Sequence, residues 1–162
     1  MLLFSRSHRA LLIGAVLGVS APAAAQSPSD TLRFINPPTL SAPHGYTHVV
    51  EVPAGSRMVY LAGQVPLDST GRLVGAGDFR AQAVQAFENL RRALAAAGAT
   101  FSDVVKLNYY VVDASQLAAL REVRDRYINT AAPPASTLVE VRRLFRGDVL
   151  LELEATAVIR DR

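Results

Sequence analysis

The 162-residue chain contains no cysteine. This absence excludes disulfide bonds, zinc sites built from thiolates and catalysis by a cysteine nucleophile. Basic residues exceed acidic ones only slightly, with 17 Lys+Arg against 14 Asp+Glu, and no basic run is interleaved with aromatic residues. Because nucleic-acid-binding domains concentrate positive charge in such patches, we expect no nucleic-acid partner.

Long hydrophobic runs are also scarce. The apolar segment at residues 10–19 is too short to cross a bilayer, which takes about 20 residues. Arg6 and Arg9 precede this segment without an acid, and the small residues of a cleavage site follow at 23–25. These features predict a secretory signal peptide at residues 1–25 and export to the periplasm or the medium, without membrane attachment after cleavage. The alternative, an uncleaved anchor, is disfavoured by the short apolar run.

Without residues 1–25 the chain has the length of one ordinary domain with its own core. Residues 26–43 are rich in Ser, Pro and Thr, and we interpret them as an N-terminal linker. Within this linker, residues 33–36 have the composition of an edge strand. The folded domain is then expected over residues 44–162.

The hydrophobic pattern of this domain predicts five strands and two helices. Asp78 is a good N-cap for the first helix, which Gly98 ends. The first two strands, separated by turn residues, are expected to form a hairpin. Strands are predicted at 46–52, 58–62, 104–112, 137–141 and 149–158, and the second helix at 115–128.

The order ββαβαββ predicts an α+β fold, with both helices packed on one face of a mixed sheet. Each helix has a single apolar stripe, so covering one face of the sheet uses both helices. No predicted element remains to cover the other face. We therefore expect the protein to form an oligomer.

Three segments carry residues that could form a site. Gly63 lies at a strand end before Pro66, where it allows a close backbone approach, although an ordinary strand exit explains it equally well. Ser136 follows two prolines at the start of a strand. Such prolines can also serve only to end a helix and begin the strand. Glu152 and Glu154 face the same side of a strand. They indicate either an exposed face or a site where one acid's raised pKa permits proton transfer.

Taken together and in order, these segments resemble the Rid (reactive intermediate deaminase, YjgF-type) family over residues 46–158. The resemblance implies a chorismate-mutase-like α+β fold and a homotrimer with ligand clefts between subunits. It also implies hydrolysis of enamines or imines to a keto acid and ammonia, without metal or cofactor. The matching motifs are Ala-Gly-Gln-Val-Pro at 62–66, Ala-Ala-Gly at 96–98, Asp-Val-Val-Lys at 103–106, Pro-Ala-Ser-Thr-Leu-Val-Glu-Val at 134–141 and Leu-Glu-Leu-Glu-Ala at 151–155.

The resemblance also assigns the site residues by position. Glu152 matches the family's water-activating acid, and Tyr46 matches an aromatic residue near the cleft entrance. Arg121 stands where active deaminases often have asparagine. The substrate-binding set implied by the family is Tyr46, Gly63, Arg121, Ser136, Thr137 and Leu138.

One departure from the family pattern bears on function. Active members carry an arginine that binds the substrate carboxylate at the position of Ser136, and commonly a serine at the position of Ala62. An arginine makes a charge-assisted bidentate pair with a carboxylate, whereas a serine offers one neutral hydrogen bond. Arg121 is a candidate substitute for the missing charge.

Two functions follow from this pattern. The first is a hydrolase similar to 2-iminobutanoate/2-iminopropanoate deaminase, acting through Glu152 on a non-standard substrate. The second is a non-catalytic trimer that binds a small molecule or a partner in the same clefts. Chorismate mutase activity would rest on fold alone and is weakly supported.

Overall fold

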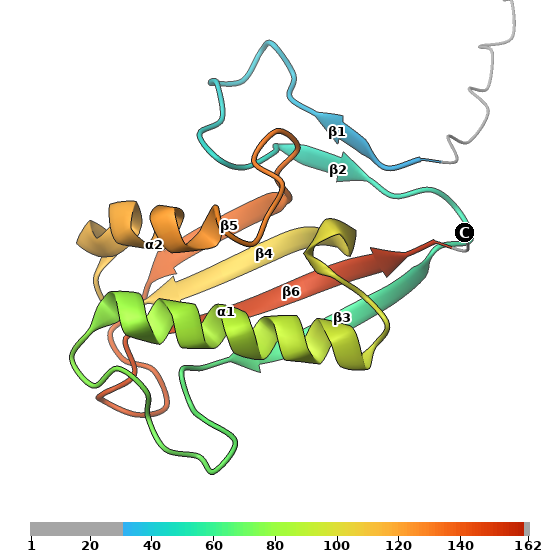
Figure 1. The fold of residues 1–162 in the computed structure, drawn as a ribbon. Helices are drawn as coiled ribbons and strands as arrows, with labels where there is room; N and C mark the ends of the chain where they lie inside the picture. The colour runs from blue at the N-terminus through green and yellow to red at the C-terminus, as the bar shows by residue number, and fades with distance from the viewer. Residues whose placement is uncertain (1–30, 161–162) are drawn as a thin grey trace, which may run out of the picture.

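The computed structural model describes residues 31–160, and the predicted signal peptide lies outside them. Four strands form a mixed sheet in the order β3-β6-β4-β5, in which only β4 and β5 are parallel. Two further strands form a separate small sheet, β1-β2 (Figure 1). The elements are β1 (Arg33–Ile35), β2 (Val49–Glu51), β3 (Arg57–Gln64), α1 (Phe79–Ala96), β4 (Val104–Val111), α2 (Leu117–Arg124), β5 (Ala135–Glu140) and β6 (Leu151–Ile159), with short 3₁₀ turns at Phe101–Asp103 and Ala114–Gln116.

Helix α1 begins and ends where the sequence predicts. The side chain of Asp78 accepts a hydrogen bond from the backbone N–H of Ala81 at 3.1 Å, which satisfies one of the free amides of the first turn. Gly98 follows the last turn with φ of +75°, a conformation that glycine adopts without strain. The inner face of α1 is fully buried at Phe87 and Leu90.

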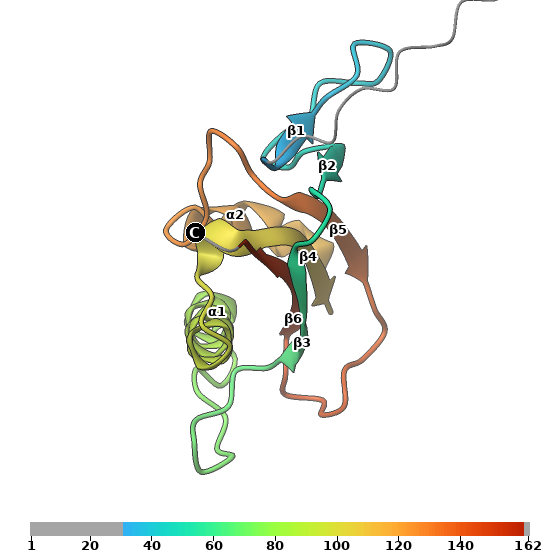
Figure 2. The same cartoon turned by 90° about the vertical axis from the view of Figure 1, so that its right-hand side faces the viewer.

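The core lies between the four-stranded sheet and the two helices, which occupy the same side of the sheet (Figure 2). Leu107, Leu151 and Leu153 of the sheet are fully buried against α1 and α2. Each such side chain contributes about 1.5–3 kcal/mol on burial. The predicted arrangement of two helices on one face is confirmed. Among residues 31–160, no helix is long and apolar enough to cross a membrane.

The predicted hairpin of the first two strands is wrong. β2 is shorter than predicted and pairs with β1, with Arg33 opposite Glu51, while β3 pairs with β6, with Met58 opposite Val158. The alternating pattern of β3 determines which of its side chains face the core, and this pattern is compatible with pairing to β2 or to β6. The edge strand expected near residues 33–36 is present as β1.

Helix α2 is also shorter than predicted. A 3₁₀ turn precedes it, and after Arg124 the backbone amides of Arg126 and Tyr127 bond to carbonyl oxygens only three residues earlier. These tight turns lead the chain toward Pro133 and Pro134, which cannot continue a helix.

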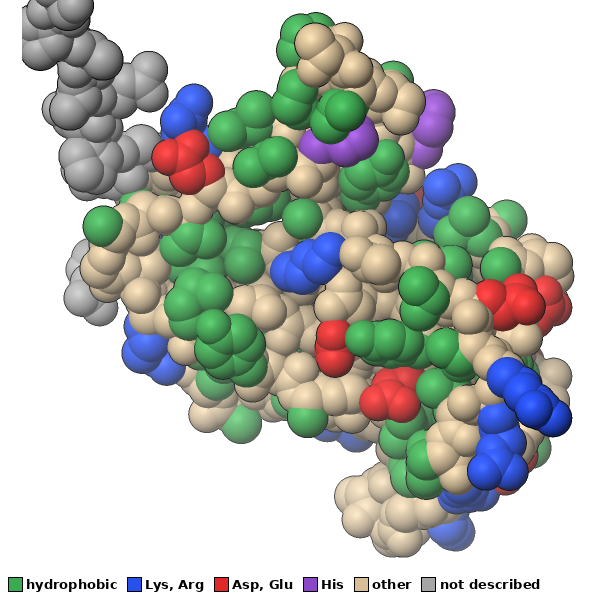
Figure 3. All heavy atoms as spheres, turned by 180° about the vertical axis from the view of Figure 1, so that it is seen from behind, with side chains coloured by type: hydrophobic (Ala, Val, Ile, Leu, Met, Phe, Trp, Pro, Cys, Tyr) green, Lys and Arg blue, Asp and Glu red, His purple; other side chains and the backbone are tan. Residues whose placement is uncertain are grey.

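The opposite face of the main sheet carries no covering element among residues 31–160. Large apolar side chains are exposed on the outer strands, including Tyr60 at 79%, Met58 at 41% and Val139 at 39% of their area. Figure 3 shows this open face from behind, with apolar side chains beside acidic and basic ones. We call it the open face below.

Candidate functional site

A pocket of about 180 Å³ lies between α2, β5 and the segment at residues 44–46. We call it the α2 pocket. Four of the residues that the family resemblance assigns to substrate binding line it: Tyr46, Arg121, Ser136 and Leu138. The full lining comprises His44, Gly45, Tyr46, Tyr109, Leu117, Leu120, Arg121, Arg124, Ser136 and Leu138.

The segment that carries Tyr46 is held firmly against the rest of the domain. The backbone N–H of Thr47 donates to Pro134 O at 3.2 Å, and its hydroxyl donates to Pro133 O at 2.6 Å. Arg124 Nη1 donates to Gly45 O at 2.9 Å. Gly45 has φ of +77°, and a Cβ there would lie 2.4 Å from Arg124 Nη2. A larger residue at this position would strain the backbone and would displace the Arg124 guanidinium.

Two arginines lie on the same side of α2, three residues apart, and they differ in their contacts. The side chain of Arg124 is only 9% exposed and pairs with Asp125 at 2.7 Å. Arg121 Nη2 reaches His44 O at 3.5 Å, and no ion pair within residues 31–160 includes Arg121. Because Arg121 lines the pocket, it is available there as a positively charged donor.

Tyr109 and Arg124 are pocket residues that the sequence analysis missed. Tyr109 lies on the core-facing side of β4, and burial raises its pKa above the ordinary tyrosine value, an effect that nearby Arg124 partly opposes. Its hydroxyl is therefore neutral at physiological pH. The spacing of Arg124 from Arg121 could have indicated a shared helix face. No sequence signal distinguishes Tyr109 from an ordinary core residue.

Glu152 lies on the open face rather than in the α2 pocket. It is opposite Tyr110 in the β4-β6 ladder, between the core residues Leu151 and Leu153. A Cβ built on Gly63 would lie 1.7 Å from Glu152 Oε1, so the carboxylate packs directly against the backbone of Gly63. Two residues that the resemblance assigns to the site are thus brought together here.

Thr137 also belongs to the open face. It is opposite Asn108 in the β4-β5 ladder and accepts a hydrogen bond from Lys106 Nζ at 2.7 Å. Its neighbours Ser136 and Leu138 point to the helix side and line the α2 pocket. The predicted site residues therefore form two groups, on opposite faces of the sheet.

The second acid of the pair, Glu154, is held by its neighbours. It accepts hydrogen bonds from Asn108 Nδ2 at 2.6 Å and from the Tyr110 hydroxyl at 2.9 Å. The hydrogen bond to Glu154 raises the pKa of Tyr110. Both acids are partly exposed, as on an accessible sheet face. Within residues 31–160 no group of three or more His, Cys, Asp or Glu is arranged to hold a metal ion.

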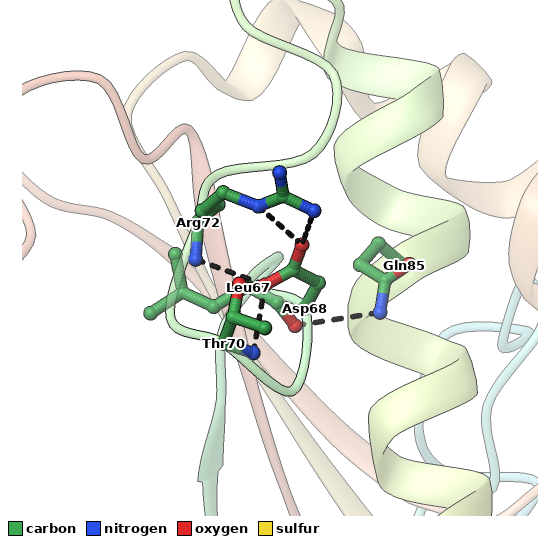
Figure 4. A network of polar contacts seen from close by, with 5 residues as sticks. All are labelled: Leu67, Asp68, Thr70, Arg72 and Gln85. Atoms are coloured by element: carbon green, nitrogen blue, oxygen red, sulfur yellow. Dashed lines mark hydrogen bonds and ion pairs between the residues drawn. The ribbon is translucent and has the colours of Figure 1, made fainter.

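The loop that follows Gly63 is fixed by the network in Figure 4. Asp68 accepts hydrogen bonds from the backbone and hydroxyl of Thr70 and from the backbone and side chain of Arg72. Leu67 O accepts hydrogen bonds from Gln85 at 3.4 Å and from Asn89 at 2.8 Å, both on α1. These contacts anchor the exit of β3 and thereby the backbone beneath Glu152.

The mixed sheet with two helices on one face is the α+β fold of Rid-type, YjgF-like proteins. The chain belongs to the family described as Endoribonuclease L-PSP, whose sequence profile matches residues 38–159. These findings confirm the family and the fold that the resemblance implied.

Several relatives are similar to this chain over most of its length. It is 42% identical over 113 residues to Protein DfrA of Myxococcus xanthus, covering 70% of this chain and 84% of that protein. It is 37% identical over 135 residues to the 2-iminobutanoate/2-iminopropanoate deaminase of Salmonella typhimurium, covering 82% and 99%. A crystal structure of the Rid-family protein YyfB from Yersinia pestis superposes with a TM-score of 0.69 at 37% identity, covering 79% of this chain and 98% of that one.

Proposed function

We propose that the protein is a cofactor-free hydrolase of imines or enamines, in which Glu152 acts on water. The observation that carries this proposal is the contact between the Glu152 carboxylate and the backbone of Gly63 on the open face. A carboxylate that packs against backbone at a strand exit can hold a water molecule beside a substrate. The similarity to a 2-iminobutanoate/2-iminopropanoate deaminase over nearly the whole of that enzyme supports the same chemistry.

The active unit in this proposal is a homotrimer. Glu152 and the α2 pocket lie on opposite faces of the sheet, so one chain alone does not bring them together. Exposed apolar residues on the open face, such as Tyr60, favour its burial against another copy. A closed ring of three copies would bring the Glu152 carboxylate of one subunit to the α2 pocket of the next.

The proposed reaction uses Glu152 first as a base and then as an acid. Glu152 takes a proton from water while the water oxygen bonds to the imine carbon, and the C=N π electrons move to nitrogen. The nitrogen takes the proton from Glu152, giving a carbinolamine. Glu152 next takes the hydroxyl proton as C=O forms, the C–N bond breaks, and the nitrogen takes that proton and leaves as ammonia.

The substrate in this proposal differs from the standard imino acids. Ser136 lines the pocket at the position where the family pattern has a carboxylate-binding arginine. A serine hydroxyl can give only one neutral hydrogen bond there. Recognition of the substrate therefore depends on the other residues of the α2 pocket.

The test measures ammonia release from carboxylate-bearing imines and from uncharged imines by the protein and its Glu152→Gln variant. We expect the substitution to lower the rate about 100-fold or more. Glu51→Gln, which alters an exposed acid on β2, serves as the matched control and should leave the rate unchanged. Equal rates for wild type and Glu152→Gln would overturn the proposal. RNA is included as a further substrate, because the family description names an endoribonuclease.

A second candidate function is a non-catalytic trimer that binds a small molecule in the same clefts. The α2 pocket favours this function because Ser136 stands at the position of the family's arginine, and β5 carries no other arginine. Ligand binding without turnover of either imine class would support this function over the hydrolase.

We also propose that the protein is exported through residues 1–25. Arg6 and Arg9, the apolar run and the small residues at 23–25 support this proposal. Export would separate the protein from cytoplasmic sources of short-lived imines, which agrees with a non-standard substrate. N-terminal sequencing of the secreted or periplasmic protein should give Gln26 as the first residue.

A further inference from the structure

The walls of the α2 pocket are largely apolar. Leu117 and Leu120 of α2 face Leu138 of β5, and the aromatic residues Tyr46 and Tyr109 complete the lining. The pocket volume is about 180 Å³. An apolar protein cavity of about 150 Å³ is large enough for benzene. The pocket therefore accommodates an apolar body of about six carbon atoms, considerably larger than the methyl or ethyl group of the smallest imino acids.

The polar side of the pocket is positive. Arg121 and Arg124 both line it, and none of the lining residues that residues 31–160 of one chain supply is an acid. The charge of Arg124 is paired with Asp125, and the same guanidinium also donates to Gly45 O. Arg124 therefore positions the segment that carries Tyr46, and its charge is already balanced.

Arg121 differs because its donors are largely unused. Within residues 31–160, Arg121 makes one hydrogen bond, to His44 O at the 3.5 Å limit of such a contact, and no carboxylate there pairs with it. A guanidinium beside an apolar pocket gains most from a ligand carboxylate, which accepts two parallel hydrogen bonds. Ser136 adds a neutral hydroxyl on the opposite wall.

We infer that the α2 pocket binds a monocarboxylate whose apolar body is aromatic or branched and contains about six carbons, with Arg121 as the residue that binds its carboxylate. The assignment of this ligand as the substrate rests on the proposed hydrolase function. The binding itself does not rest on it. Arg121 thus takes the anion from the α2 side of the pocket rather than from β5.

The test titrates three probes into the assembled protein by calorimetry: 3-phenylpropanoate, its uncharged amide, and propanoate. We expect Arg121→Gln to weaken binding of 3-phenylpropanoate about tenfold or more, and to change binding of the amide less than about twofold. Arg126→Gln is the matched control, because Arg126 is an exposed arginine just after α2 that does not line the pocket. Arg121→Lys keeps the charge and should retain a preference for the carboxylate over the amide.

Equal affinity of Arg121→Gln and Arg126→Gln for 3-phenylpropanoate would overturn the role of Arg121. Equal or tighter binding of propanoate by the wild type would overturn the size of the ligand. Absence of binding for all three probes would overturn the inference as a whole. These results are independent of turnover, so ammonia release by Glu152→Gln still tests the proposed hydrolase by itself.

Discussion

At the scale of single residues, Gly63 has the most specific structural role. A Cβ atom at Gly63 would lie only 1.7 Å from Glu152 Oε1, so the carboxylate uses the space that a side chain would fill. Sequence reasoning could propose a close backbone approach at Gly63 but could not identify what approaches it. The answer depends on the pairing of β3 with β6, which no local pattern specifies.

Gly63→Ala is expected to lower imine hydrolysis to nearly the level of Glu152→Gln, because the new methyl group displaces the carboxylate. The free energy of unfolding should change by about 1 kcal/mol or less, since Glu152 is partly exposed and can move outward. Gly147→Ala is the control, because a Cβ at Gly147 meets no atom within 4 Å. Full activity of Gly63→Ala would show that the position of Glu152 is unimportant for the reaction.

The pocket residues show how far the sequence alone could predict the site. Tyr46, Arg121, Ser136 and Leu138 were expected together because of the family resemblance, and the structure places all four around one pocket. Arg124 was missed because its spacing from Arg121 indicates a shared helix face but does not indicate burial. Its burial depends on Asp125 and on the carbonyl of Gly45, which is distant in the sequence.

At the scale of elements, local signals determined the success of each prediction. Helix α1 was predicted well because Asp78 and Gly98 mark the two ends of a continuous apolar stripe. The hairpin of the first two strands was wrong because alternation defines a buried face and leaves the partner strand open. In the structure β3 pairs with β6, and this pairing buries Leu61 of β3 in the core.

The loop after β3 makes a prediction about pH at this scale. Hydrogen bonds from the side chain of Thr70 and then from the backbone of Arg72 hold the pKa of Asp68 below its ordinary value. A lowered folded-state pKa stabilises the fold above the pKa of the unfolded chain, which is about 4. This contribution is lost as the pH falls below that value.

We therefore expect wild type to be more stable than Asp68→Asn at pH 7, and the difference to shrink as the pH is lowered from about 5 toward 2. The measurement is the urea midpoint of both proteins at several pH values. Asp68→Asn retains the size of the side chain, so packing of the loop is conserved. A difference between the midpoints that stays constant with pH would contradict the role of the ionised carboxylate.

At the scale of the whole molecule, the open face and the separation of Glu152 from the α2 pocket both support the proposed homotrimer. Two helices suffice for one face of the sheet, so the oligomer was expected from the order of elements alone. The family resemblance implied clefts between subunits, but it did not show which of the site residues lie on each face of the sheet. Glu152 on β6 and Ser136 on β5 lie on either side of β4 in the same sheet, and their side chains face opposite sides of it.

Subunit complementation tests this shared site directly. Glu152→Gln and Arg121→Gln are each expected to hydrolyse the preferred carboxylate-bearing imine poorly as pure proteins. Co-expressed with different affinity tags and purified through both, mixed trimers contain some interfaces at which an intact Glu152 meets an intact Arg121. Whichever variant is present twice, each mixed trimer has one such intact site among its three, so ammonia release should recover to about a third of the wild-type level.

If each site instead lay within one chain, every site of a mixed trimer would contain either Glu152→Gln or Arg121→Gln. Activity of the mixed trimers would stay at the level of the two pure variants.

Tyr60→Lys provides the matching structural measurement, since a charge at this exposed apolar position should oppose burial of the open face. We expect this variant to elute as a single chain in gel filtration. Its rate of imine hydrolysis should fall with the fraction that is monomeric, because a lone chain separates Glu152 from the α2 pocket.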